Sequence, residues 1–186
     1  MRREGGEAVL LILSGRPGAG KTTLARRLAG ELGATYLRID TIEETIAAVG
    51  SGVGALGYTV AYAIARDNLD AGNTVIADCV NSIEITRIAW RAVAAAAGRN
   101  ALEIEIVCSD PVEHRRRVEA RLTGGKSRPT WADVVAREDE RRTPPVPRVE
   151  TAGRSEEDGL RDILALLAEH ETEKAPPGEQ TGPSRT

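Results

Sequence analysis

The chain has 186 residues and a mass of 19.8 kDa, which suits one globular domain. A hydrophobic fraction of 41% excludes a wholly disordered chain, and a net charge of −3 argues against binding nucleic acid or anionic membranes by bulk charge. No apolar run approaches the roughly 18 residues that span a bilayer, so we expect a soluble cytoplasmic protein. We expect one domain over residues 1–170 and a disordered tail over 171–186, which is rich in Pro, Gly, Glu and Thr.

The first half of the chain alternates short apolar runs with helix-forming segments. The run VLLIL predicts a strand buried on both faces, and a glycine-rich turn follows it at residues 15–20. Leucines at a spacing of four then predict a helix that ends at Gly33. The elements predicted in this half are a strand at 9–13, a helix at 22–32, a strand at 35–39, helices at 41–49 and 58–69, a strand at 74–77 and a helix at 82–97.

The second half repeats the same alternation. Thr130 and Asp133 have the spacing of a capping box, which indicates the start of a helix. The elements predicted in this half are a strand at 102–107, a helix from Pro111, a helix from the capping box to about 141, a strand at 148–151 and an amphipathic helix at 155–169. Five strands that alternate with helices predict an α/β fold with an open parallel sheet and helices on both faces.

Residues 15–22 read GRPGAGKT, which matches the phosphate-binding motif G-x-x-x-x-G-K-[ST] in full. In such a loop backbone N–H groups surround phosphate oxygens, and the following helix adds its positive N-terminal end. Lys21 is expected to reach the β and γ phosphates of ATP, and the Thr22 hydroxyl is expected to bind Mg²⁺. The predicted nucleotide-binding residues here are Gly15, Arg16, Pro17, Gly18, Ala19, Gly20, Lys21, Thr22 and Thr23.

Missing motifs argue against two other classes of nucleotide-binding protein. The sequence has no N-K-x-D guanine signature and no D-x-x-G switch after the loop, which argues against a GTPase. No apolar strand ends in Asp-Glu, the pair that polarises water in many ATPase motors. A small kinase needs instead a carboxylate on the acceptor side and arginines over the transferred phosphate.

Two carboxylates end predicted strands, and the carboxyl ends of parallel strands line a ligand crevice. Asp40, in YLRID, is expected to orient or deprotonate an acceptor hydroxyl, and capping of the next helix together with Glu43 is a compatible alternative. Asp78, in TVIAD, is expected to bind a magnesium-ligated water or the acceptor, with a turn residue as the alternative. Asn81 is a candidate acceptor contact or a turn residue, and we favour the turn.

Several arginines follow the predicted fourth strand. Arg117 and Arg121 are four residues apart and share a helix face, so both are expected to contact ATP and to stabilise the transferred phosphate. Arg128 lies in a loop at about 122–130 that we expect to act as a lid over ATP, and it is a candidate substrate contact. A solvated helix face is the alternative for such a charged run.

Structural roles are expected for the remaining distinctive residues. His114 is predicted at the surface, and Trp90 and Trp131 are predicted in the core. Cys79 and Cys108 each follow a predicted strand. If the first strand lies between these two, about 10 Å separates the cysteines, which exceeds the limit of roughly 7 Å for a disulfide. We therefore expect free thiols.

The sequence resembles the small P-loop kinases of the adenylylsulfate kinase, chloramphenicol phosphotransferase and polynucleotide kinase group over about residues 8–152. The phosphate loop carries the resemblance, with a lid-like pattern D-P-x(5)-R-x-x-x-R from Asp110 to Arg121 and the later stretch REDERRTPP. It implies a three-layer P-loop NTPase fold with strand order 2-3-1-4-5 and a small lid. It also implies that Asp40 contacts or activates the acceptor hydroxyl.

The resemblance places an acceptor-side region at about residues 41–72. Tyr58 and Tyr62 lie within it, and with Glu43 they are expected to contact the substrate. Similar polynucleotide kinases carry Arg where this chain has Glu43, three residues after the acceptor Asp. An acidic residue there disfavours a nucleic-acid acceptor and suits a neutral or cationic small molecule.

These observations predict a kinase that uses ATP and Mg²⁺ to phosphorylate a hydroxyl of a small molecule, such as a metabolite, a nucleoside-like compound or an antibiotic. A polynucleotide 5′-hydroxyl kinase and a nucleotide-dependent regulatory binding protein are the alternatives. We expect a monomer or a homodimer, and we expect neither a membrane nor a nucleic-acid partner.

Overall fold

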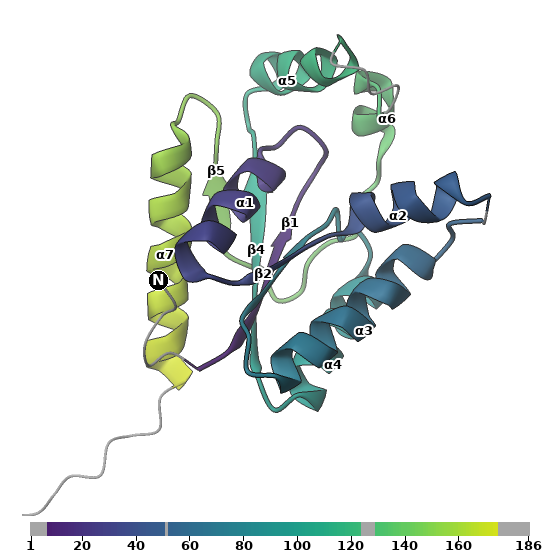
Figure 1. The fold of residues 1–186 in the computed structure, drawn as a ribbon. Coiled ribbons are helices and arrows are strands. Elements are labelled where there is room, and N and C mark those ends of the chain that lie inside the picture. Colours follow the sequence, from purple (N-terminus) through teal and green to yellow (C-terminus); the bar gives the residue numbers. More distant parts are fainter. Residues whose placement is uncertain (1–6, 51, 124–128, 175–186) are drawn as a thin grey trace, which may run out of the picture.

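Five parallel strands form one sheet with helices on both faces (Figure 1). The structure is a computed structural model, which describes residues 7–50, 52–123 and 129–174. The strand order is β2-β3-β1-β4-β5, in agreement with the order expected from the resemblance. The strands are β1 (Val9–Ser14), β2 (Thr35–Arg38), β3 (Val75–Asp78), β4 (Asn100–Val107) and β5 (Arg148–Glu150).

The helices form two layers around the sheet and a group beyond its carboxyl edge. Helices α1 and α7 cover one face and α3 and α4 the other, whereas α2, α5 and α6 lie toward the carboxyl ends of the strands (Figure 1). The helices are α1 (Lys21–Leu32), α2 (Ile39–Ala48), α3 (Leu56–Asp70), α4 (Glu84–Ala96), α5 (Pro111–Thr123), α6 (Trp131–Ala136) and α7 (Glu156–Lys174).

The central position of β1 explains its continuous apolar sequence. All six of its residues are buried. Successive side chains of a strand point to opposite faces, so Leu11 and Leu13 pack with α1 and α7 while Leu10 and Ile12 pack with α3 and α4. Because both faces are covered, β1 has no position for a polar side chain before Ser14. The phosphate loop therefore starts from a strand that is buried along its whole length.

Asp40 lies in the first turn of a helix, whereas the sequence predicted it at the end of a strand. Strand β2 ends at Arg38, which is the N-cap of α2, and α2 begins at Ile39. The predicted capping by Asp40 and Glu43 does not form, because the helix starts before Asp40. The Asp40 carboxylate pairs with Arg38 instead, with Nη2 2.7 Å from Oδ2.

Helix α6 ends at Ala136, earlier than the predicted end near residue 141. Its capping box is confirmed at Thr130. The chain leaves the helix at Arg137, whose carbonyl oxygen accepts a hydrogen bond from Arg16 Nη2 at 3.2 Å. The phosphate loop therefore holds the segment that follows α6.

The same segment also sets the start of α4, which begins at Glu84 and not at Ser82 as predicted. The Glu140 carboxylate accepts a hydrogen bond from the Glu84 backbone N–H at 2.5 Å, and the Glu140 N–H donates to the Ser82 carbonyl oxygen at 2.9 Å. A side chain 56 residues away thus supplies the cap that the local sequence lacks.

Three further predictions can be compared with the structure. Helix α7 continues to Lys174, so residues 171–174 are helical and the predicted tail began too early; residues 175–186 lie outside the described part. Cys79 and Cys108 are free thiols, and their strands flank β1 as predicted. Within the described ranges, no helix has the length and apolar character needed to cross a membrane.

Replacing Ile104 tests the importance of the α1/α7 layer. Ile104 lies on β4, is fully buried and packs in that layer. We expect Ile104→Ala to lower the free energy of unfolding by about 2–5 kcal/mol, because it leaves a cavity in a packed core. Urea denaturation followed by circular dichroism measures this. Ile85→Ala is the control, because Ile85 is 71% exposed and its loss should cost less than about 0.5 kcal/mol. Equal losses in the two variants would contradict this assignment of the core.

Candidate functional site

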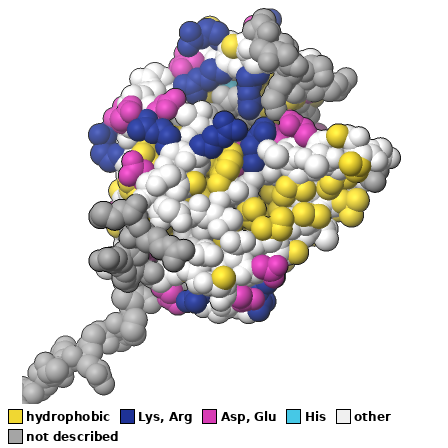
Figure 2. Space-filling view, viewed as in Figure 1, with side chains coloured by type: hydrophobic (Ala, Val, Ile, Leu, Met, Phe, Trp, Pro, Cys, Tyr) yellow, Lys and Arg dark blue, Asp and Glu magenta, His cyan; other side chains and the backbone are white. Residues whose placement is uncertain are grey.

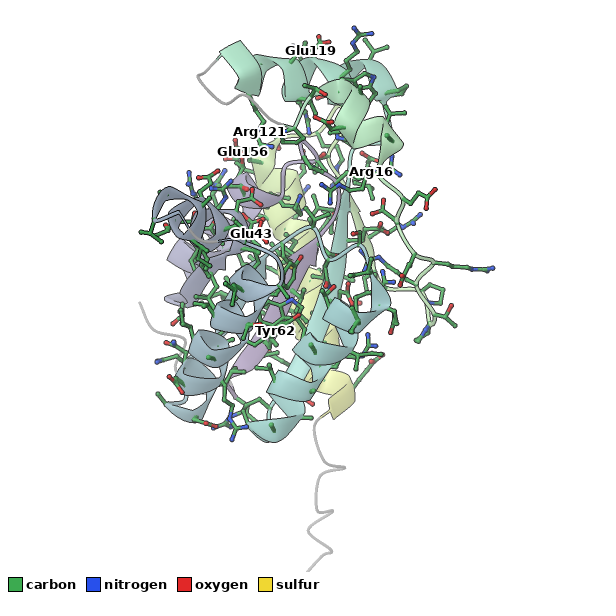
Figure 3. All side chains as sticks on the ribbon, turned by 90° about the vertical axis from the view of Figure 1, so that its right-hand side faces the viewer. Arg16, Glu43, Tyr62, Glu119, Arg121 and Glu156 are labelled. Atoms are coloured by element: carbon green, nitrogen blue, oxygen red, sulfur yellow. The ribbon has the colours of Figure 1, made fainter. Side chains whose placement is uncertain are left out.

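A cavity of about 1110 Å³ lies at the carboxyl edge of the sheet. Helices α2 and α3 form one wall, and α5, α6 and the start of α7 form another, with the phosphate loop between them. Figure 3 shows Glu43 and Arg121, which belong to these two walls. The predicted site residues that line the cavity are Pro17, Gly18, Gly20, Lys21, Thr22, Thr23, Asp40, Glu43, Tyr58, Asp78, Arg117 and Arg121.

Glycines allow the phosphate loop to pack closely against its neighbours. Gly15 has a φ of 135°, and a Cβ there would lie 2.2 Å from the carbonyl oxygen of Ile106. Gly18 has a φ of 86°, and its Cβ would lie 2.6 Å from Val118 Cγ2. Both positions therefore exclude a side chain by backbone conformation and by space. Helix α1 begins directly after Gly20 with no side-chain cap, which leaves a helix N-terminus suited to a phosphate.

The Lys21 ammonium group lies inside the loop and not in solvent. Lys21 is 7% exposed, and its Nζ donates a hydrogen bond to the carbonyl oxygen of Arg16 at 2.9 Å. Burial lowers the pKa of Lys21, and the nearby carboxylates of Asp78 and Asp40 oppose that change. A cation buried among loop amides has the position and charge required to bind a phosphate.

Asp78 is a buried carboxylate that lines the cavity. It is 3% exposed, and its Oδ2 accepts hydrogen bonds from the Thr22 hydroxyl at 2.7 Å and the Tyr36 hydroxyl at 2.9 Å. Arg38 Nε lies 3.8 Å from the same oxygen. These donors keep a buried carboxylate in one orientation. Burial and Asp78 together raise the pKa of Tyr36 to about 12, so Tyr36 remains a donor.

The wall formed by α2 and α3 carries a second group of carboxylates. Asp40, Glu43 and Glu44 line it. Burial raises the pKa of Glu43, and the nearby Asp40 carboxylate raises it further. Gly57 on α3 permits this packing, because a Cβ there would lie 2.4 Å from Glu43 Cγ. This wall is therefore acidic, with Glu43 among its carboxylates.

Tyr58 adds a hydroxyl to the same wall. Its oxygen accepts a hydrogen bond from the Asn81 backbone N–H at 3.1 Å, so the hydroxyl proton of Tyr58 is left for another acceptor. Burial raises the pKa of Tyr58, so the phenol stays protonated. Tyr58 and Glu43 thus combine a donor and a carboxylate on one side of the cavity.

Arginines line the opposite wall. Lys and Arg side chains gather between α5 and the upper ends of α1 and α7 (Figure 2). Arg117 and Arg121 both line the cavity, but Arg117 is already bonded: its Nη1 lies 2.9 Å from Thr151 Oγ1 and its Nη2 lies 2.6 Å from Glu113. Arg117 therefore joins α5 to the end of β5. Arg128 and most of the predicted lid lie outside the described residues.

Comparison with known proteins agrees with this architecture. The AAA domain family model matches residues 10–145. The chain belongs to this family. No curated protein sequence matches it.

Three solved structures share the fold of this AAA domain at low sequence identity. The APS kinase CysC of Mycobacterium tuberculosis, solved with AMPPNP and APS, has a TM-score of 0.68 and 20% identity over 87% of this chain and 98% of its own. A gluconokinase from Sinorhizobium meliloti 1021 has a TM-score of 0.64 and 16% identity over 93% and 97%. Kti12 of Chaetomium thermophilum, solved with ADP-AlF3, has a TM-score of 0.68 and 20% identity over 87% and 98%.

Thr22 and Asp78 have the chemistry required to hold Mg²⁺ with a nucleotide. The Thr22 hydroxyl donates a hydrogen bond to Asp78, which leaves the lone pairs of the Thr22 oxygen for a cation. Mg²⁺ prefers oxygen ligands and keeps several waters, so few protein ligands are needed. No cluster of three or more His, Cys, Asp or Glu suited to a metal occurs within the described ranges.

The structure places several predicted site residues outside the cavity wall. Gly15, Arg16 and Ala19 belong to the loop but do not line the cavity, and Arg16 Nε pairs with Asp139 at 2.8 Å. Asn81 is fully buried with a φ of 52°, and its Nδ2 donates a hydrogen bond to Glu103 Oε1 at 3.0 Å. Tyr62 lies between α3 and α4 (Figure 3), where its ring packs edge-on against Trp90 at 4.6 Å.

His114 is the clearest residue that the sequence assigned to the wrong environment. It was predicted at the surface, but it is buried, and its Nε2 lies 2.8 Å from the carbonyl oxygen of Pro17. Trp131 contacts the His114 ring edge-on at 5.3 Å and is partly buried, not fully in the core. Helix α5 is therefore anchored to the phosphate loop, and no local motif in its sequence indicates this.

Tyr36 and Arg38 were also missed, although a signal for them exists. They are two residues apart on β2, so they share one face of the sheet with Asp78, which pairs with Arg38 in register. A strand that alternates Leu37 with two long polar side chains at a sheet edge could have indicated a polar network. The pairing partner, however, is set by the tertiary fold.

The three tyrosines of the chain should resist ionisation together. Burial is the main cause that raises the pKa of each, to about 12 for Tyr36 and Tyr62 and further for Tyr58. We expect little tyrosinate absorbance near 295 nm in the native protein at pH 10, and a rise at that pH when urea unfolds it. Because these pKa values are higher in the folded state, their contribution to stability is full below pH about 10 and is lost as the pH rises toward 12. A native titration midpoint near 10 would contradict the burial of these rings.

Proposed function

We propose that this AAA domain transfers the γ-phosphate of ATP to a hydroxyl group of a small molecule. One observation supports this most: a single cavity is lined by Lys21, Thr22 and Asp78 and also by Asp40. Lys21 lies close enough to both carboxylates for their charges to affect its pKa. Phosphate-binding groups and a carboxylate for the acceptor therefore face the same space, as transfer between two bound substrates requires.

The loop residues would bind and orient the nucleotide. The backbone of residues 15–20 and the start of α1 would surround the phosphates, and Lys21 would exchange its bond to the Arg16 carbonyl for the β and γ phosphate oxygens. Mg²⁺, when bound with ATP, would neutralise charge on the transferred group. Arg121, and Arg117 after release from its partners, would add positive charge from the opposite wall.

Asp40 would place the acceptor. In the proposed step the acceptor oxygen attacks the γ-phosphorus, the bond from that phosphorus to the β–γ bridging oxygen breaks, and ADP leaves. The hydroxyl proton is accepted by the Asp40 carboxylate. Arg38 already holds Asp40 Oδ2 at 2.7 Å, which fixes the direction of the carboxylate.

The acidic wall supports a small neutral or cationic acceptor. Asp40, Glu43 and Glu44 line this part of the cavity, and Tyr58 adds a donor. A nucleic-acid acceptor would bring phosphates next to carboxylates, which is electrostatically unfavourable. A metabolite, a nucleoside-like compound or an antibiotic with a free hydroxyl fits better.

Removing the Asp40 carboxylate tests this assignment. We expect Asp40→Ala to keep ATP binding within about twofold while phosphate transfer falls by at least about a hundredfold, as for the loss of a positioned base. Equilibrium binding of AMPPNP with Mg²⁺ and product formation measure the two effects. Asp70→Ala is the matched control, because Asp70 is also an arginine-paired carboxylate but is exposed on α3. Full transfer by Asp40→Ala would remove Asp40 from the mechanism.

A nucleotide-dependent regulatory protein is the second candidate, because Kti12, solved with ADP-AlF3, shares the fold. The decisive experiment incubates the protein, ATP and Mg²⁺ with a panel of hydroxyl-bearing metabolites, nucleosides and antibiotics, followed by mass spectrometry. A product that gains one phosphoryl group supports the kinase and identifies the acceptor. Tight Mg·AMPPNP binding without any product would favour the regulator. A 5′-hydroxyl oligonucleotide in the panel tests the polynucleotide kinase.

A further inference from the structure

Arg38 occupies a position between the two carboxylates of the site. It is the last residue of β2 and the N-cap of α2, and it lies opposite Asp78 in the β2–β3 register. Its side chain is 9% exposed. A guanidinium at the junction of strand and helix can therefore reach both the sheet edge and the first turn of α2.

All three nitrogens of the Arg38 guanidinium point to this region. Nη2 pairs with Asp40 Oδ2 at 2.7 Å, and Nη1 donates to Thr41 Oγ1 at 3.2 Å. Nε lies 3.8 Å from Asp78 Oδ2. One planar group thus spans the carboxylate proposed for the acceptor and the carboxylate beside the phosphate loop.

The Arg38 Nε–H is a buried donor that has no hydrogen-bond partner among the residues the structure describes. The cause is visible at Asp78, whose Oδ2 already accepts hydrogen bonds from Thr22 and Tyr36. A carboxylate oxygen offers about two lone-pair sites, so both sites of Oδ2 are taken. A buried donor without a hydrogen bond costs free energy. Arg38 Nε–H should therefore bond to Asp78 Oδ2 when one of the lone pairs of that oxygen becomes free.

We propose that Arg38 is a positioning residue that fixes Asp40 relative to Asp78 and so aligns the acceptor hydroxyl with the bound phosphate. This inference rests on the proposed kinase function. A fork with several donors in one plane can hold two carboxylates at a set spacing, whereas a lysine supplies one point charge. Without Arg38, Asp40 would lose the contact that sets its direction.

Variants at position 38 separate this role from a general role in stability. The measured activity is the release of ADP from Mg·ATP with water as the acceptor. This assay does not require the natural acceptor to be known. Binding of Mg·AMPPNP is measured in parallel. We expect Arg38→Met to bind Mg·AMPPNP within about twofold of the wild type and to release ADP about a hundredfold more slowly, and we expect the same loss of ADP release in Asp40→Ala. Arg38→Lys, which keeps the charge, should lose roughly tenfold because it can hold only one carboxylate at a time.

A double-mutant cycle tests whether Arg38 acts through Asp40. If it does, Arg38→Met adds no more than about threefold to the loss caused by Asp40→Ala, because the contact is already absent. If the double variant loses as much activity as the product of the two single losses, Arg38 acts independently of Asp40, and the inference is overturned. Arg66→Met is the control, because Arg66 makes an exposed pair of 2.6 Å with Asp70 outside the cavity.

Nuclear magnetic resonance gives a readout that does not depend on activity. The ¹⁵N–¹H signal of Arg38 Nε is assigned by its absence in Arg38→Lys. Tyr36→Phe frees one lone pair of Asp78, so we expect the Arg38 Nε–H to bond there, with a downfield shift and slower exchange with water; Tyr62→Phe should leave it unchanged.

The outcomes separate the two proposals. If the wild type binds no Mg·AMPPNP, the kinase proposal is overturned and this inference falls with it. If binding is normal but Arg38→Met releases ADP at the wild-type rate, or Arg38→Lys equals the wild type, the inference is overturned while the kinase proposal stands. An unchanged Arg38 Nε signal in Tyr36→Phe also counts against it.

Discussion

The buried carboxylate of Asp78 connects the parts of this molecule that must stay in register. Its Oδ2 accepts from Thr22 of α1 and Tyr36 of β2, and Asp78 itself ends β3, which pairs with β1 on its other side. A carboxylate that is 3% exposed is stable only while donors surround it. The Asp78 carboxylate therefore connects the start of α1, the edge strand β2 and the centre of the sheet through its hydrogen bonds and its place on β3. The cavity exists where these elements meet.

The phosphate loop could be recognised in the sequence, whereas the residues that hold Asp78 beside it could not. The phosphate loop is local: strand, glycines, Lys21 and helix follow each other directly, and each residue type has a backbone or charge reason. The helical layers follow from the alternation of strands and helices along the chain, whereas the strand order was implied by the resemblance alone. Tyr36 and Arg38, in contrast, act on Asp78 across two paired strands, 42 and 40 positions apart in sequence for the two residues. That pairing is a property of the sheet and has no local signature.

Errors at helix ends and at His114 have a related physical cause. Helix α4 is capped by Glu140 and α6 is followed by a segment bonded to Arg16, so both boundaries depend on side chains far away in sequence. His114 looks like part of a solvated charged run, yet the position of α5 over the loop turns it toward Pro17. Charge patterns show what a helix face can do. Packing decides which of its residues lose contact with water.

In the proposed kinase, the wall formed by α2 and α3 would allow the acceptor to change without altering the phosphate loop. Glu43 and Gly57 face each other across α2 and α3, and a Cβ at Gly57 would lie 2.4 Å from Glu43 Cγ. The acidic side chain fits only because its neighbour has none. The hydrogen bonds that hold Asp78 come from Thr22 and Tyr36 and not from these two residues, so size and charge at Glu43 and Gly57 could vary while those bonds stay intact. Arg38 is the exception, because it touches Asp40 on the acceptor side and approaches Asp78 on the other. Under the proposal, a substitution at Arg38 would disturb Asp40 and Asp78 together and so the alignment of the two substrates. A substitution at Glu43 or Gly57 would instead change which acceptor fits.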